Sequence, residues 1–161
     1  MILIGLGSNL DGIYGTPAQC LQECKALFAQ AGIYIEKSSS IWTSAPVPVS
    51  DQPWYKNSVC IVNTELDPYQ LLSALAHIED KAGRVRDEAN AARTLDLDIL
   101  SYNNEIIGDK KLQLPHTEMY KRAFVLYPLH EVAPNWIHPS LNKSVDEMIS
   151  DMPAGQEIER C

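Results

Sequence analysis

The chain has 161 residues, of which 45% are hydrophobic and 21% are charged, a balance typical of one folded domain. Thirteen basic against 21 acidic residues give a net charge of −8, which disfavours binding to nucleic acid or to an anionic membrane. Residues 81–122 differ, because they hold eight of the basic residues and only seven acidic ones. We therefore expect a small polyanionic ligand to bind in that part of the chain.

Cysteine usage and the N-terminus indicate the compartment. The four cysteines form no CxxC pair and no disulfide framework, so reduced thiols in the cytoplasm are expected. The first ten residues are apolar but lack a basic segment and contain two glycines, which favours a strand over a signal peptide. No apolar run approaches the roughly 20 residues of a membrane span. We expect a cytoplasmic monomer with one domain over residues 1–161.

The first part of the chain predicts a strand, a helix and two further strands. Residues 1–7 form an apolar run that ends in glycine, as buried strands often do. Thr16-Pro17-Ala18-Gln19 carries the signature of a capping box, and apolar residues at helical spacing follow it. Residues 33–42 and 55–66 predict the second and third strands. The proline-rich stretch 45–53 between them predicts a stiff, functional loop.

The remaining elements complete a β-α-β-β-α-β order. Asp67-Pro68-Tyr69-Gln70 repeats the capping signal at the start of a second helix, and residues 94–100 alternate as a fourth strand. This order predicts an α+β fold, a ferredoxin-like βαββαβ sandwich whose mainly antiparallel sheet has helices on one face and the other face free. The remainder predicts a turn at Asn103-Asn104 and short helices over 123–131 and 144–151.

The sharpest chemical signal is Asp96-Leu97-Asp98 in the fourth strand. Alternation places both carboxylates on the face opposite Leu97, with their Cα atoms roughly 6–7 Å apart. Such a pair suits two Mg²⁺ ions that clamp a phosphate chain. An exposed strand face with two solvated aspartates is the alternative.

Basic residues flank this pair in the sequence. Arg84, Arg86 and Arg93 offer guanidinium forks suited to phosphate oxygens, although they could instead balance acidic neighbours on a solvated loop. Residues 7–12 have the glycine spacing of a P-loop but lack its lysine and hydroxyl residue. Arginines and metal, rather than a backbone loop, would therefore hold a nucleotide. His116 follows a proline and is placed to hydrogen-bond a ligand or to stabilise its own turn.

Several motifs together resemble 6-hydroxymethyl-7,8-dihydropterin pyrophosphokinase of folate biosynthesis. They occur in the same order along nearly the whole chain: Gly7-Ser8-Asn9, Gln52 to Asn57, Gly83 to Arg86, Arg93 to Ile99, and Pro115-His116 through Phe124. The resemblance implies a single pyrophosphokinase domain over residues 1–161 that transfers pyrophosphate from ATP to the hydroxymethyl group of the pterin and releases AMP. A non-catalytic pterin or nucleotide sensor with the same pocket is the alternative, and a nucleotide-sugar transferase that binds metal through D-x-D is a third.

The resemblance also implies residue roles by position. The residues at the reacting phosphates would be Arg84, Arg93, Asp96 and Asp98. Two Mg²⁺ ions that bridge the ATP phosphates would bind Asp96 and Asp98. Further contacts to ATP would come from Arg86, Lys111, His116 and Arg122. In the pterin pocket Tyr55 and Phe124 would sandwich the ring, Asn57 would read its edge, and Ser44 and Val47 would line the walls, since two aromatic faces bind a planar body while polar groups select its edge.

Three positions depart from the pattern of that family. Residues 87–92 stand where the family commonly has a longer loop with Trp-Gly-Pro, which removes a possible lid contact. Ser44-Ala45-Pro46 replaces Thr-Pro-Pro, and Lys111 replaces an arginine, so a hydroxyl and a positive charge remain. We expect the change in loop 87–92 to affect loop closure and rate more than the reaction itself, and the other two departures to be tolerated.

Overall fold

The computed structural model describes residues 1–84 and 92–161. Its main sheet contains β1 (Ile2–Ser8), β2 (Ile33–Ser38), β3 (Trp42–Ser44), β4 (Tyr55–Thr64), β5 (Asp96–Tyr102) and β8 (Ile158–Arg160). The helices are α1 (Pro17–Gln30), α2 (Pro68–Lys81), the 3₁₀ turn η1 (Met119–Lys121), α3 (Ala123–Val132) and α4 (Val145–Asp151). A separate two-stranded sheet consists of β6 (Ile107–Gly108) and β7 (Gln113–Leu114). Within the described ranges, no helix combines the length and the apolar character needed to cross a bilayer.

The main sheet has the strand order β5-β1-β4-β3-β8, and β2 also pairs with β4. Every pair in it is antiparallel. The predicted fourth, first, third and second strands therefore lie side by side in that order, which confirms the α+β fold with a mainly antiparallel sheet. Both predicted capping boxes are present: Thr16 with Gln19 at α1, and Asp67 with Gln70 at α2.

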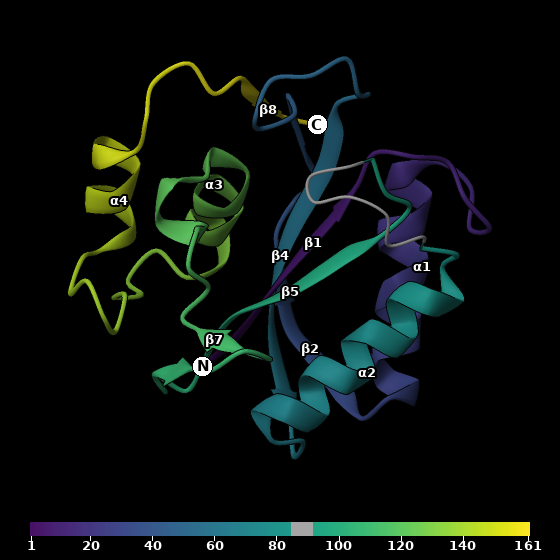
Figure 1. The fold of residues 1–161 in the computed structure, drawn as a ribbon, viewed down its shortest axis with the longest axis horizontal. Helices are drawn as coiled ribbons and strands as arrows, with labels where there is room; N and C mark the ends of the chain where they lie inside the picture. The colour runs from purple at the N-terminus through teal and green to yellow at the C-terminus, as the bar shows by residue number, and fades with distance from the viewer. Residues whose placement is uncertain (85–91) are drawn as a thin grey trace.

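Helices cover both faces of the sheet, so the prediction of a free face is wrong. Figure 1 shows α1 and α2 on one side and α3 and α4 on the other. The second core joins Leu3, Val59 and Ile61 of the sheet to Leu126 and Leu129 of α3. The physical reason is that these alternate strand positions are as apolar as those of the first core, and α3 supplies the surface that buries them.

The predicted strand over 33–42 is broken into β2 and β3. Ser39 pairs with Val59 through its backbone N–H, at 2.9 Å from the Val59 carbonyl oxygen. Its hydroxyl also accepts the Val59 N–H at 2.9 Å, in place of a backbone carbonyl. A serine side chain that competes for ladder hydrogen bonds interrupts regular pairing. β3 then pairs with β4 and with β8, a strand that the sequence did not predict.

Candidate active site

A pocket opens on one face of the sheet, over Gly5 and Gly7 of β1. In the register of the sheet, Gly7 lies between Asp96 of β5 and Asn57 of β4, and Gly5 lies between Asp98 and Val59. Because partners in register project to the same face, the two glycines leave a hollow between the side chains on either side. A Cβ atom at Gly7 would lie 3.3 Å from Asn57 Oδ1. The hollow encloses about 700 Å³ of empty space, part of it open to solvent.

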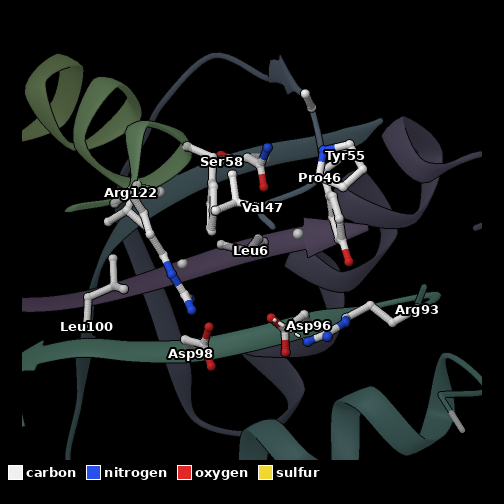
Figure 2. Close-up of a pocket in the computed structure, with 17 residues that line it drawn as sticks. Leu6, Pro46, Val47, Tyr55, Ser58, Arg93, Asp96, Asp98, Leu100 and Arg122 are labelled. Atoms are coloured by element: carbon white, nitrogen blue, oxygen red, sulfur yellow. Dashed lines mark ion pairs between the residues drawn. The ribbon is translucent and has the colours of Figure 1, made fainter. Parts of the chain in front are cut away.

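The pocket brings together most of the residues that the sequence singled out. Eight of them line it: Val47, Tyr55, Asn57, Arg93, Asp96, Asp98, Arg122 and Phe124. Figure 2 shows Arg93 beside Asp96, and Arg122 reaching from the start of α3 toward Asp98. Residues from β4, β5, α3 and the loop after β3 thus converge on one site.

Asp96 is held by two arginines. Arg84 Nη1 donates to Asp96 Oδ1 at 2.9 Å, and Arg93 Nη1 lies 3.2 Å from Asp96 Oδ2. The side chains of both arginines are mostly buried, at 17% and 16% exposure. The arginines therefore belong to the carboxylate site, and the interpretation of Arg84 and Arg93 as a solvated loop face does not fit.

Glu79 is a part of the site that sequence reasoning missed. This buried residue of α2 accepts the Leu97 N–H at 2.8 Å through Oε2, and it also pairs with Arg84. One carboxylate thus fixes both the backbone between the two aspartates and one arginine that binds Asp96. The signal was available, since Glu79 follows Leu75 by four residues and so lies on the apolar stripe of the helix.

Asp98 lies among charges of both signs, from Asp96, Glu79, Arg93 and Arg122. Burial, followed by the nearby charges of Asp96 and Glu79, raises the pKa of Asp98 above its usual range. His116 Nε2 lies 3.9 Å from Asp98 Oδ2. Burial and the charge of Arg122 lower the pKa of His116, which keeps its imidazole neutral at pH 7. His116 Nδ1 accepts the Glu118 N–H at 3.2 Å, so His116 both stabilises its turn and faces the site.

The two aspartates offer the carboxylate oxygens that Mg²⁺ prefers. In the described part of the chain, no cluster of three or more His, Cys, Asp or Glu side chains could hold a metal ion by itself. Mg²⁺ is commonly bound by one or two carboxylates, with waters and substrate phosphates as its other ligands. The carboxylate oxygens of Asp96 and Asp98 and the open pocket that both residues line match that mode.

On the β4 side of Gly7, the pocket presents the amide of Asn57. Asn57 Nδ2 donates to Ser44 Oγ at 2.7 Å, and both residues are buried. This bond fixes the orientation of the amide and leaves Oδ1 beside Gly7. The Arg122 guanidinium lies 5.5 Å from the centre of the Phe124 ring. Ser44 thus acts behind Asn57 rather than on the pocket wall.

Asn9 connects the proline-rich loop to the arginine segment. Its buried side chain donates to Gln52 Oε1 at 3.1 Å and to the Pro53 carbonyl oxygen at 3.0 Å. Asn9 Oδ1 accepts the Arg93 N–H at 2.9 Å. The sequence motif contained this residue, but nothing in the sequence indicated that one amide would bridge two segments about 40 and 80 residues away.

Three further predicted residues, Lys111, His116 and Arg84, are described by the structure but do not line this pocket. Lys111 and His116 line a second cavity, which also contains Lys110 and Thr117 and meets the first at Asp98. Arg84 bonds Asp96, as described above. Arg86 and the segment 87–91 fall outside the described residues, so the structure does not place them.

Two bacterial proteins are similar to this chain over most of their length. The chain is 43% identical over 138 residues to 2-amino-4-hydroxy-6-hydroxymethyldihydropteridine pyrophosphokinase of Haemophilus influenzae, a match covering 85% of this chain and 84% of that protein. It is 40% identical over 130 residues to the Bacillus subtilis protein of the same name, covering 80% and 75%.

Longer proteins also contain a similar region. The chain is 35% identical to a folic acid synthesis protein of Dictyostelium discoideum over 98% of its own length but only 23% of that protein. In structure it resembles the Plasmodium falciparum HPPK-DHPS crystallised with pterin and p-hydroxybenzoate, with a TM-score of 0.69, 14% identity, and coverage of 92% of this chain and 42% of that one. That similarity supports the fold alone.

The family comparison covers most of the chain. The model of 7,8-dihydro-6-hydroxymethylpterin-pyrophosphokinase matches residues 3–134, a range that contains the pocket, both aspartates and the arginines around them. With this match and relatives at 40% identity or above, the chain belongs to the 7,8-dihydro-6-hydroxymethylpterin-pyrophosphokinase family.

Proposed function

We propose that this chain transfers the pyrophosphate group of ATP to the hydroxymethyl oxygen of 6-hydroxymethyl-7,8-dihydropterin in folate biosynthesis. The observation that carries the proposal is the glycine-floored pocket, in which the two carboxylates lie on the β5 side of Gly5 and Gly7 and the fixed amide of Asn57 lies on the β4 side. Arginines and aromatic rings belong to the same lining. The charged groups suit a metal-bound polyphosphate, and the amide with the rings suits a flat heterocycle.

Among the charged groups, Asp96 and Asp98 would hold two Mg²⁺ ions. These ions, when bound, would neutralise the phosphate oxygens and align the triphosphate. Arg93 and Arg122 face the same space and would stabilise charge that develops on the transferred group. Lys111 and His116, from the adjoining cavity, would contact ATP, and so would Arg86.

The amide and the rings would bind the pterin. Tyr55 and Phe124 would pack against its ring, and Asn57 would hydrogen-bond its edge through the amide that Ser44 orients. Val47, at the mouth of the pocket, would contact the ring from the loop. Gly7 leaves the room that the ring needs, because any side chain there would approach Asn57.

The chemistry is one displacement at phosphorus. The hydroxymethyl oxygen attacks the β-phosphorus of ATP and forms the new P–O bond, while the bond from that phosphorus to the bridging oxygen of the α-phosphate breaks. AMP leaves with the bridging oxygen, and the hydroxyl proton is released. The protein contributes alignment and charge stabilisation, which dominate phosphoryl transfer. We further propose that residues 1–161 act as one monomeric domain.

The test is product identification. Purified protein with ATP, Mg²⁺ and the hydroxymethyl dihydropterin should form AMP and the pterin diphosphate in equal amounts, and omission of the pterin should abolish AMP formation. Release of ADP, or no nucleotide product, would contradict the proposal. Calorimetry that showed tight pterin binding without turnover would support the non-catalytic sensor, for which neither the site nor the comparisons offer a specific observation.

A further inference from the structure

The segment 153–160 is hydrogen-bonded to two parts of the chain that line the pocket, the loop after β3 and the start of α3. In β8, Ile158 pairs with Ser44 of β3, and the Ala45 N–H donates to the Glu157 carbonyl oxygen at 3.0 Å. These bonds attach the segment to the loop that carries Val47. The same segment borders a groove next to the pocket, whose lining includes Pro46 and Arg122. Figure 1 shows β8 beside the loop that follows β3.

The side chain of Gln156 attaches this segment to the start of α3. Gln156 Nε2 donates to the Lys121 carbonyl oxygen at 2.9 Å, and Gln156 Oε1 accepts the Ala123 N–H at 2.9 Å. Lys121 and Ala123 are the residues on either side of Arg122. One amide therefore holds the backbone on both sides of the arginine that reaches toward Asp98 in Figure 2.

Gln156 provides a hydrogen-bond acceptor for the first turn of α3. The residue at its N-cap position is Arg122, whose side chain makes no capping bond. The first N–H groups of a helix have no acceptor within the helix, and Ala123 is buried, so its N–H has no easy access to water. Gln156, 33 residues away in the sequence, supplies the acceptor.

We propose that Gln156 is a positioning residue that aims Arg122 at the reacting phosphates and joins that arginine to the loop that carries Val47. This inference rests on the role of Arg122 in the proposed function. A segment that served only to extend the sheet would need only its backbone hydrogen bonds. Here the side-chain nitrogen and oxygen of Gln156 bond the residues before and after Arg122. The family match ends at residue 134, so the segment lies outside it.

The test compares two substitutions in the same segment. Gln156→Met keeps the length of the side chain and removes both hydrogen bonds. Arg160→Met is the control, because Arg160 bonds Ser40 and pairs with Glu131, away from Arg122. We expect Gln156→Met to lower kcat for AMP formation about tenfold, equal to ~1.4 kcal/mol in activation free energy. Arg160→Met should keep kcat within about twofold of the wild type, even where the two variants lose similar thermal stability.

A double-mutant cycle separates positioning from general loosening. In an Arg122→Lys background, which keeps a charge on a flexible stem, Gln156→Met should reduce kcat by less than about twofold further. An unchanged kcat in the single variant, or the same tenfold loss in both backgrounds, would overturn the inference.

Amide hydrogen exchange makes the inference testable without turnover. The Ala123 N–H should exchange faster in Gln156→Met than in the wild type, and Arg160→Met should leave its exchange rate unchanged. If the wild type forms no AMP, the proposed function fails while this measurement still reports on Gln156. If exchange at Ala123 is equal in Gln156→Met and the wild type, Gln156 does not hold the start of α3.

Discussion

Replacement of Glu79 by alanine tests the energetics of the carboxylate site. The Glu79 side chain is buried and accepts both the Leu97 N–H, at 2.8 Å, and Arg84. Glu79→Ala leaves the Leu97 N–H, which lies between Asp96 and Asp98, without its acceptor. The same change removes one of the two carboxylates that Arg84 pairs with in the described part of the chain and leaves its bond to Asp96.

The expected cost follows from these contacts. Both bonds are made to the Glu79 carboxylate, and the loss of a hydrogen bond to a charged group costs about 1.5–3 kcal/mol. Arg84 is 17% exposed and keeps Asp96 at 2.9 Å, so we take the low end of that range for each bond. We therefore expect Glu79→Ala to lower the free energy of unfolding by about 3 kcal/mol, or Tm by roughly 6–12 °C for a chain of this size. Glu79→Gln keeps an acceptor for Leu97 and should lose about half as much.

Urea and thermal unfolding at pH 7 measure this effect. The control is Glu23→Ala, because Glu23 is an exposed helical glutamate on α1 and should change stability by less than about 0.5 kcal/mol. If Glu79→Ala is as stable as Glu23→Ala, the buried carboxylate does not hold β5, and the argument from its hydrogen bonds is wrong. Activity should fall in parallel, because the strand that carries the aspartates loses its anchor.

Three further substitutions test other parts of the site. Asp98→Ala should abolish AMP formation through loss of a metal ligand, and full activity would show that the aspartate pair is only structural. Tyr55→Ala should weaken pterin binding in calorimetry by about 1–3 kcal/mol, the range for stacking of a base on an aromatic ring. Tyr55→Phe keeps the ring and should retain most of the affinity. Equal losses in the two variants would assign the effect to the hydroxyl. Asn9→Ala should lower the free energy of unfolding by about 2 kcal/mol, because it breaks the bonds to Gln52, Pro53 and Arg93. The same change should raise KM for the pterin. An unchanged KM would show that the proline-rich loop 45–53 holds its shape without Asn9.

Local signals predicted the elements that local physics determines. The two capping boxes lie in consecutive residues, so the starts of α1 and α2 could be predicted from the sequence. The alternation around Asp96 and Asp98 likewise predicted that both face one side, because side-chain direction in a strand has a period of two. The role of Asp96 and Asp98 as metal ligands stays a prediction.

Features that depend on distant partners were not predictable in the same way. The prediction of a free sheet face was wrong. The sequence indicated a helix over 123–131, but it did not indicate that this helix packs on the second face of the sheet. Gln156 acts on residues more than 30 positions away, and its amide carries no local signal of that partner. The position of Glu79 on the apolar stripe of its helix indicated burial, but its partners Arg84 and the Leu97 N–H meet it only in three dimensions.

The position of β5 in the sheet has a consequence for association between molecules. β5 is an outer strand of the main sheet, and a strand with one unpaired side can recruit a strand from another chain. Glu79 takes the Leu97 N–H, and the His116 N–H donates to the Leu100 carbonyl oxygen at 2.9 Å. The contacts made by Glu79 and His116 therefore also occupy backbone groups of β5 through which a strand of a second molecule would pair. Substitutions that remove these contacts would favour aggregation as well as loss of activity.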